Sequence, residues 1–335
     1  MKKLKNYEVL VKALNNFSLV NLDINVLRRG ENVFKKIKEL EAEVKAKILY
    51  DPYLSFIEEN GEPFTLSTVR NTKNWDGTLE YSTDTQNWSE WNGSKISSSS
   101  DGKLYLRGIG NSNISMSDGH TNSFLLTDEK RIQCLGNIEN LLDYKTVAAG
   151  SHPVMGNYCY GSMFDECVSL TKAPDLPAIT LAEGCYHGMF YGCTSLTEAP
   201  EELPATTLAY GCYSDMFCDC TSLTTAPKLP ATTLADSCYS NMFESCKSLT
   251  AAPKLLATTL ADYCYSDMFR NCTSLTQVSD LPATTLADDC YVGMFIECTS
   301  LTGVIHCPAS IANDKNRLNA DNDDIPDTAT VVYDL

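Results

Sequence analysis

The chain has 335 residues, of which 43% are hydrophobic and 21% are charged, and its formal charge is −17. This length exceeds what one hydrophobic core usually fills, and the composition excludes a chain that is disordered throughout. The negative charge lies mainly in residues 151–335, where it opposes the binding of a nucleic-acid backbone. Because no run of about 18 apolar residues occurs, we expect no membrane span.

Residues 1–50 are basic, with 11 Lys and Arg against 6 Asp and Glu, and they have a helical pattern. Apolar residues recur there at steps of three and four, which predicts a helix with one apolar face. These residues are Val33, Ile37, Leu40, Val44 and Ile48. The pattern covers roughly two heptads, so we predict an N-terminal helical anchor that forms a homo-oligomer or packs against the next domain.

Residues 51–130 have the pattern of a β domain. Asn-Gly, Asp-Gly and Ser-rich turns separate runs of strand length, which predicts a small β-sandwich. The predicted strands are Tyr53–Ile57, Phe64–Val69, Leu79–Ser82 and Lys103–Arg107. Trp75, Trp88 and Trp91 all lie in this region. Exposed aromatic rings can stack on sugars, so these three are candidates for a glycan platform, and packing in the core or in turns is the alternative.

One pattern recurs six times from residue 159 onward: Cys-Tyr-x-x-Met-Phe-x-x-Cys-x-Ser-Leu-Thr. Each copy is followed by a variant of Leu-Pro-Ala-Thr-Thr-Leu-Ala, and the copies repeat at steps of 26 or 27 residues. Their first cysteines are Cys159, Cys185, Cys212, Cys238, Cys264 and Cys290. A fixed period of this length is typical of a solenoid or a propeller, whose copies are stable only when stacked.

Within each copy, positions are counted from the first cysteine, which is position 0. Positions 0, 1, 4, 5 and 8 do not vary between copies, whereas positions 2, 3, 6 and 7 do. On a helix with about 100° per residue the two sets occupy opposite arcs. This predicts a two-turn amphipathic helix with a buried Cys/Tyr/Met/Phe face. The segments Ser-Leu-Thr and Thr-Thr-Leu-Ala are predicted to be extended, so each copy would combine a helix with short strands.

Twelve of the 15 cysteines belong to this pattern. Two cysteines eight residues apart on a helix are separated by about 12 Å, which is beyond the reach of a disulfide. We therefore predict a ladder of buried free thiols, with bridges between adjacent copies as the alternative. The absence of a Cys-x-x-Cys pair argues against a metal site. Cys218 occupies a varying position and is the thiol we expect to be exposed, if any is.

The repeats resemble BspA-like (Treponema-type) leucine-rich repeats. The resemblance is carried over residues 159–302 by units such as Leu260–Thr276. The segment Gly136–Leu142 resembles the degenerate first unit that often precedes such arrays. The resemblance implies a curved α/β solenoid, here over about residues 131–312, that serves adhesion and recognition of proteins or glycans without catalysis. This chain differs from exported members of the family because it lacks a recognisable signal peptide.

The end of the chain, residues 313–335, is predicted to form a C-terminal cap in which Thr328–Tyr333 is a closing strand. The acidic stretch before this strand resembles the calcium loop of thrombospondin type 3-like repeats, with candidate ligands Asp321, Asp323 and Asp327. Asp324 stands where that motif has Gly, so we favour a solvated acidic turn and predict no metal.

Together these patterns predict a multidomain chain with N-terminal helices, a small β-sandwich and an α/β leucine-rich-repeat solenoid of six repeats. We find no phosphate loop, nucleophile elbow or paired-His motif, and we therefore expect no enzyme activity and no cofactor. We predict a recognition or adhesion protein that binds a protein or a glycan on a cell or particle surface. The candidate contact residues occupy varying positions, and a solvated helix face is the alternative for each: His187, Tyr191, Asp215, Asp219, Asn241, Glu244, Asp267, Arg270 and Asn271.

Three classes of protein fit this prediction. The start of the chain, Met1–Lys3, is followed by polar residues rather than by the hydrophobic run of a signal peptide, so we expect synthesis in the cytoplasm without classical secretion. We therefore favour a structural fibre or decoration protein of a phage virion. A bacterial cell-surface adhesin and an intracellular protein-interaction scaffold are the alternatives.

Overall fold

The structure is a computed structural model that describes residues 52–115, 123–126, 130–318 and 325–334. These residues belong to one compact unit, which begins at Ile48. The predicted N-terminal helices lie outside the described residues. The same holds for the predicted oligomerisation residues Val33, Ile37, Leu40, Val44 and Ile48.

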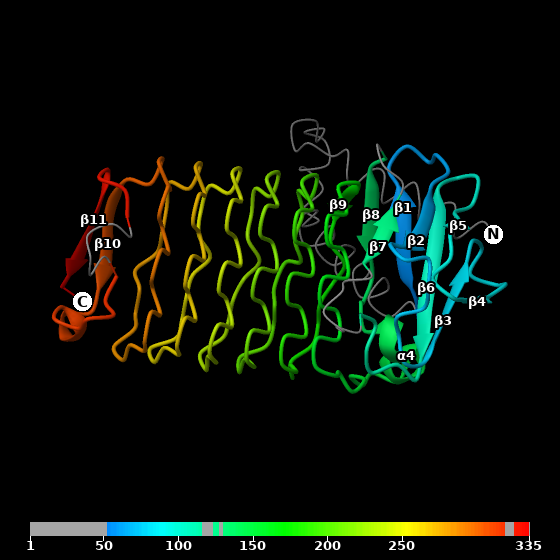
Figure 1. The fold of residues 1–335 in the computed structure, drawn as a ribbon, viewed down its shortest axis with the longest axis horizontal. Helices are drawn as coiled ribbons and strands as arrows, with labels where there is room; N and C mark the ends of the chain where they lie inside the picture. The colour runs from blue at the N-terminus through cyan, green and yellow to red at the C-terminus, as the bar shows by residue number, and fades with distance from the viewer. Residues whose placement is uncertain (1–51, 116–122, 127–129, 319–324, 335) are drawn as a thin grey trace, which may run out of the picture. The chain divides into compact units, whose positions relative to one another are not determined.

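Two β-sheets form the first part of this unit (Figure 1). The larger sheet contains, in spatial order, β4 (Ser89–Trp91), β3 (Thr78–Ser82), β6 (Lys103–Ile109), β1 (Leu54–Glu58), β8 (Ile132–Leu135) and β9 (Leu170–Lys172). The smaller sheet contains β5 (Ile96–Ser97), β2 (Thr65–Thr68) and β7 (Phe124–Leu126). The strands predicted at β1, β2, β3 and β6 are thus confirmed, and in β1 and β6 every second residue is buried.

The helix α4 (Asn140–Ala148) packs against β6 and was not predicted. Its close approach depends on Gly108, since a Cβ atom there would lie 1.6 Å from the backbone oxygen of Leu141. Asn111 donates a side-chain hydrogen bond to the same oxygen at 2.9 Å. A glycine in the strand therefore makes room for the helix backbone.

The larger sheet continues from the β region into the repeats. β1 pairs antiparallel with β8, and β8 pairs in parallel with β9, which belongs to the first copy, so the sheet crosses the boundary predicted at residue 130. Phe124 in β7 packs edge-on against Phe164 of that copy, with ring centroids 5.8 Å apart. Its backbone N–H donates to the oxygen of Met163 at 2.7 Å. The two sheets are therefore the layer on which the first copy stacks.

The fold class predicted for the repeats was wrong, because the six copies contain no helix; α4 is the one α-helix among the described residues. Positions 0 to 8 instead form overlapping turns with hydrogen bonds between residues three apart. Examples are the bond from Met163 N to Tyr160 O (3.1 Å) and the bond from Cys167 N to Phe164 O (3.0 Å). Each copy has a left-handed φ at positions −1, 3 and 7, which an α-helix of L-residues excludes. An α/β leucine-rich-repeat solenoid is thereby ruled out.

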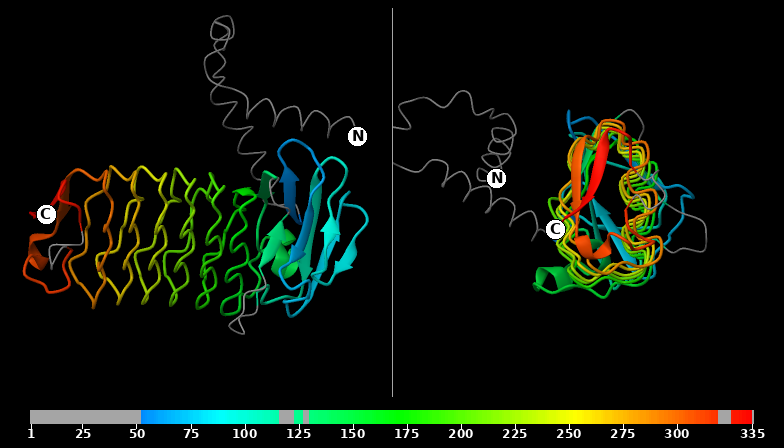
Figure 2. Two further views of the ribbon diagram at one scale, coloured as in Figure 1. Left: turned by 45° about the horizontal axis from the view of Figure 1, so that its top comes forward. Right: turned by 90° about the vertical axis from the view of Figure 1, so that its left-hand side faces the viewer.

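Alternate backbone N–H groups in these turns donate to the next copy. Tyr160 N bonds to Cys185 O and Phe164 N to Met189 O, both at 2.8 Å. The rest of each copy is joined to its neighbour by single parallel bridges, such as Thr207 to Thr233. Each copy is therefore one coil; successive coils stand side by side in Figure 1, and their outlines overlap in the end-on view of Figure 2.

The interior of the coils is formed by columns of identical side chains. The rings at position 1 and at position 5 stack on those of adjacent copies, with centroids 5.4 to 6.0 Å apart. The thiol at position 8 donates to the backbone oxygen of the Phe one copy earlier, as from Cys246 to Phe217 at 3.1 Å. All 15 cysteines are buried and free. The predicted burial of positions 0, 1, 4, 5 and 8 and the predicted free thiols are confirmed.

The last copy is covered by β10 (Gly303–Cys307), the short 3-10 helix η2 (Ala309–Ile311) and β11 (Ala329–Tyr333). β10 and β11 pair in parallel, and Leu281 N bonds to His306 O at 3.0 Å. The predicted closing strand corresponds to β11. Of the predicted calcium candidates, Asp321 and Asp323 lie outside the described residues, and Asp327 is exposed.

Candidate functional site: the variable wall

Equivalent positions of the six copies align into columns. Side chains at positions 0, 1, 4, 5 and 8 are buried in every copy, whereas those at positions −2, −1, 2, 3, 6 and 7 are exposed or half-buried in most copies. The second set contains residues 157, 158, 161, 162, 165 and 166 of the first copy and their equivalents. We call it the variable wall, because its residues differ from copy to copy.

All nine predicted contact residues lie on this wall, and several touch across copies. Asp215 contacts His187 of the preceding copy, with 3.5 Å between Oδ2 and Nε2. It accepts a 3.0 Å hydrogen bond from Nδ2 of Asn241 in the next copy. Within one copy, Arg270 pairs with Asp267 at 3.3 Å. The wall is therefore a connected polar surface, formed by turns rather than by the predicted helix face.

Carboxylates crowd this wall and change each other's pKa values. Burial and the neighbouring Glu166 raise the pKa of Asp165 to about 6. Burial and then the charge of Asp267 raise the pKa of Glu244. The wall therefore carries a negative potential at neutral pH.

Cys218 is not the exposed thiol that its varying position predicts. It is 4% exposed, and burial together with Asp219 and Glu244 raises its pKa. Its Sγ lies 3.9 Å from a carboxylate oxygen of Asp219 and 4.0 Å from one of Glu244. A buried thiol beside two carboxylates has little thiolate character and reacts slowly.

The tryptophans predicted as a glycan platform lie away from the variable wall, in the β region. Trp75 and Trp91 are 4% and 1% exposed and stack on each other, with centroids 5.2 Å apart. Trp88 is half-buried, and the guanidinium of Arg107 lies 4.0 Å from its ring centroid. Trp75 and Trp91 are core residues, so neither ring offers a face to a sugar.

Sequence reasoning missed the residues at positions −2 and −1, among them Tyr158, Glu183 and Tyr210. Tyr210 is 52% exposed, and Tyr158 is half-buried against the backbone of Gly184. The turns repeat every four residues, so positions −2 and −1 have the same phase as positions 2 and 3. Counting backward from the first cysteine with that period would have included them.

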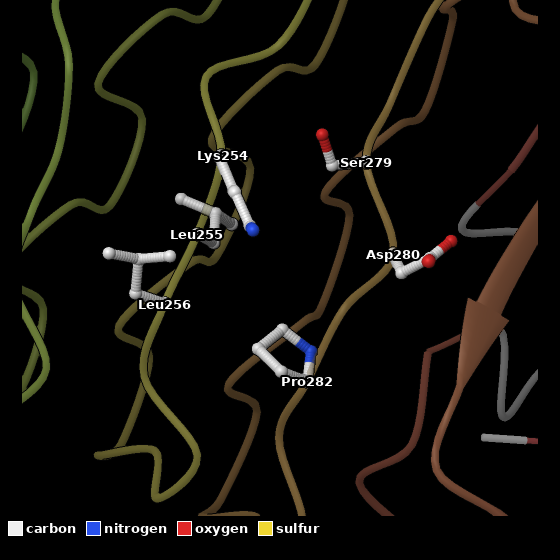
Figure 3. A pocket seen from close by; sticks show the side chains of 6 residues that line it. All are labelled: Lys254, Leu255, Leu256, Ser279, Asp280 and Pro282. Atoms are coloured by element: carbon white, nitrogen blue, oxygen red, sulfur yellow. The ribbon is translucent and has the colours of Figure 1, made fainter.

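A shallow pocket lies on the coils, and none of the predicted contact residues lines it (Figure 3). It has a volume of about 520 Å³ and is lined by Lys254, Leu255, Leu256, Ser279, Asp280 and Pro282. Leu256 stands where the other copies have Pro. In Figure 3 the carboxylate of Asp280 points away from the leucines, so the polar groups do not converge on the pocket.

Within the described ranges, no group of three or more His, Cys, Asp or Glu side chains is placed to hold a metal ion. Over the same residues, no helix has the length and apolar character needed to cross a membrane. No family model, no curated protein and no solved structure matches this chain. The resemblance to BspA-like repeats therefore rests on the repeat residues alone and stays a prediction.

Proposed function

We propose that this chain is a recognition protein whose variable wall binds a partner on a cell or particle surface, without catalysis. The observation that carries the proposal is the division of each copy into columns that never change and columns that do. A polar wall that varies over an invariant, rigid interior is suited to contact with a ligand, because its residues are held in place before binding.

The wall has the features of a preorganised binding surface. Its residues sit on turns fixed by backbone hydrogen bonds on both sides, such as that from Ser162 N to His187 O at 2.8 Å. Side chains including Asp215 and Asn241 are oriented by bonds across copies. Tyr191 and Arg270 are exposed, and residues of these two types often dominate binding energies.

The proposal is tested by binding of the labelled full chain to a panel of bacterial cells and purified surface polysaccharides. We expect the double variant Tyr191→Ala/Arg270→Ala to bind at least about tenfold more weakly, since each truncation removes an exposed contact. The matched control is Thr233→Ala/Thr259→Ala, which changes exposed residues outside the wall. Equal binding by both double variants would contradict the proposal.

The place of the protein on a phage virion is part of the same proposal. It predicts that mass spectrometry of purified particles detects the chain. Its detection only in a soluble cell fraction would favour the intracellular scaffold instead.

A further inference from the structure

We propose that the N-terminal end of the variable wall holds a binding site for an uncharged saccharide, formed by Tyr158 and Tyr210 around Gly184. The inference rests on the proposed function and names the ligand class for one part of the wall. Tyr158 belongs to the first copy, Gly184 to the second and Tyr210 to the third, so the site extends over three coils.

Gly184, which is buried and has no side chain, lies between the two tyrosines and makes room for the ring of Tyr158. It has a φ of +56°, and a Cβ atom there would lie 2.3 Å from Cε1 and 2.5 Å from Cδ1 of Tyr158. The ring of Tyr158 therefore lies directly over the Gly184 backbone. On the other side, Gly184 N donates to the backbone oxygen of Tyr210 at 2.9 Å.

The exposure of the Tyr210 ring is not explained by packing. Tyrosines at position 1 are buried in every copy, whereas Tyr210 is 52% exposed in a column where the last three copies have Asp. These are Asp236, Asp262 and Asp288. An exposed tyrosine offers an apolar face and a hydroxyl, which suits the C–H face and the hydroxyl groups of a sugar ring.

Two carboxylates next to the rings add hydrogen-bond acceptors. Tyr158 N donates to the backbone oxygen of Glu183 at 2.8 Å, and Gly184 N donates to that of Tyr210 at 2.9 Å, so Glu183 lies beside both tyrosines in the ladder of turns. Asp215 contacts His187, whose ring lies edge-on to Tyr158 with centroids 6.3 Å apart. Ionised carboxylates only accept hydrogen bonds, so both suit a ligand rich in hydroxyl donors.

The charges around the site select against ionic ligands. No Lys or Arg occurs in residues 157–169, 183–194 or 209–220, so an anionic sugar or a phosphate is repelled. The carboxylates also have protein partners, because Glu183 accepts from Asn157 at 3.4 Å and Asp215 contacts His187. They therefore act as oriented acceptors rather than as unpaired counter-ions for an organic cation.

The test compares two glycines of the same column. Gly184→Ala places a Cβ atom in the ring of Tyr158, whereas Gly211→Ala meets nothing within 4 Å; both have a left-handed φ, of +56° and +53°. The full chain is titrated with uncharged oligosaccharides of glucose, galactose, mannose and N-acetylglucosamine. We expect at least one to bind, Gly184→Ala and Tyr210→Ala to weaken it about tenfold or more, and Gly211→Ala to change it less than about twofold.

Three results would overturn the inference: none of these sugars binds, Gly184→Ala and Gly211→Ala weaken binding equally, or choline binds in place of the sugar. Circular dichroism of both glycine variants separates loss of the site from loss of the fold. If cell binding still depends on Tyr191 and Arg270 while no sugar binds, only this inference fails. If no wall variant alters cell binding, the proposed function fails as well.

Discussion

The interior columns hold the same residue in all six copies, whereas the columns of the variable wall change from copy to copy. An interior ring such as Phe217 contacts its equivalents in both neighbouring copies, so any replacement disturbs two interfaces. A wall residue such as Tyr191 has one face toward solvent. A four-residue period therefore separates side chains that form the interior from side chains that face solvent within a single short segment.

The period has a direct consequence for how the wall can diversify. Every fourth residue has a left-handed φ, and Gly, Asn, Asp and Ser fill most of these positions. Residues of these types adopt that conformation at low cost or bond locally. Side-chain identity on the wall can therefore change from Gly188 to Asp215 to Asn241 while the backbone hydrogen bonds to the adjacent copies stay the same.

The interior thiols give the largest expected effect. Burial raises the pKa of Cys290 to about 11 and that of Cys298 to about 12, and all 15 thiols are buried. Below the pKa of about 8.5 that a thiol has in the unfolded chain, every thiol is neutral in both states. Thiol titration therefore does not change the free energy of unfolding in that range. Above this pKa the unfolded state loses protons first, so the free energy of unfolding falls by about 1.4 kcal/mol per pH unit for each thiol whose pKa is raised by burial. Urea unfolding in a reducing buffer should show a steep loss above about pH 9.

A variant of the wall sharpens this prediction. Cys218→Ser removes one titrating thiol outside the invariant columns. The free energy of unfolding should therefore fall less steeply with pH, by about 1.4 kcal/mol per pH unit, which is the contribution of one proton. A urea midpoint that stays constant up to pH 10 would mean that the thiols are accessible to water, and it would break the distinction between interior and wall.

Truncation of an interior ring should be the next largest effect. The ring of Phe217 lies between those of Phe190 and Phe243, at centroid distances of 5.4 and 5.6 Å. We expect Phe217→Ala to lower the free energy of unfolding by about 3–5 kcal/mol, because it leaves a cavity in a continuous stack. The wall counterpart Tyr191→Ala should change it by less than about 0.5 kcal/mol. Urea unfolding measures both, and similar losses would show that the wall is part of the core.

Much of the repeat could be predicted because its period and its burial pattern are sequence properties. Invariance at positions 0, 1, 4, 5 and 8 identified the buried residues without knowledge of the backbone. The same holds for β1 and β6, whose alternation has a period of two residues. The close approach of α4 was not visible, since it depends on Gly108 in a strand and on contacts distant in sequence.

The backbone conformation of the copies could not be predicted from the angular positions of the residues on a helix alone. Positions 0, 1, 4, 5 and 8 lie on one face whether the period is 3.6 or 4.0 residues, so a helix and a series of turns bury the same side chains. The glycines Gly184, Gly188 and Gly192 were the contrary signal, because three glycines at steps of four weaken a helix but suit left-handed turns. Because the pattern was counted from the first cysteine, Tyr158 and Tyr210, which precede that cysteine, were not recognised as wall residues.

The smallest expected effect tests the turns directly, because helix and turn predict opposite signs. Ser162 has a φ of +52° at position 3 of the first copy, whereas Ser240, at position 2 of the fourth copy, does not have a left-handed φ, and both lie within the predicted helix. We expect Ser162→Gly to raise the free energy of unfolding by up to about 1 kcal/mol, since glycine relieves the left-handed strain, and Ser240→Gly to lower it by about 0.5–1 kcal/mol. In a helix both replacements would destabilise by similar amounts. Urea unfolding of the two variants therefore distinguishes a wall built on turns from one built on helices. A lower free energy of unfolding in both variants would favour the helix.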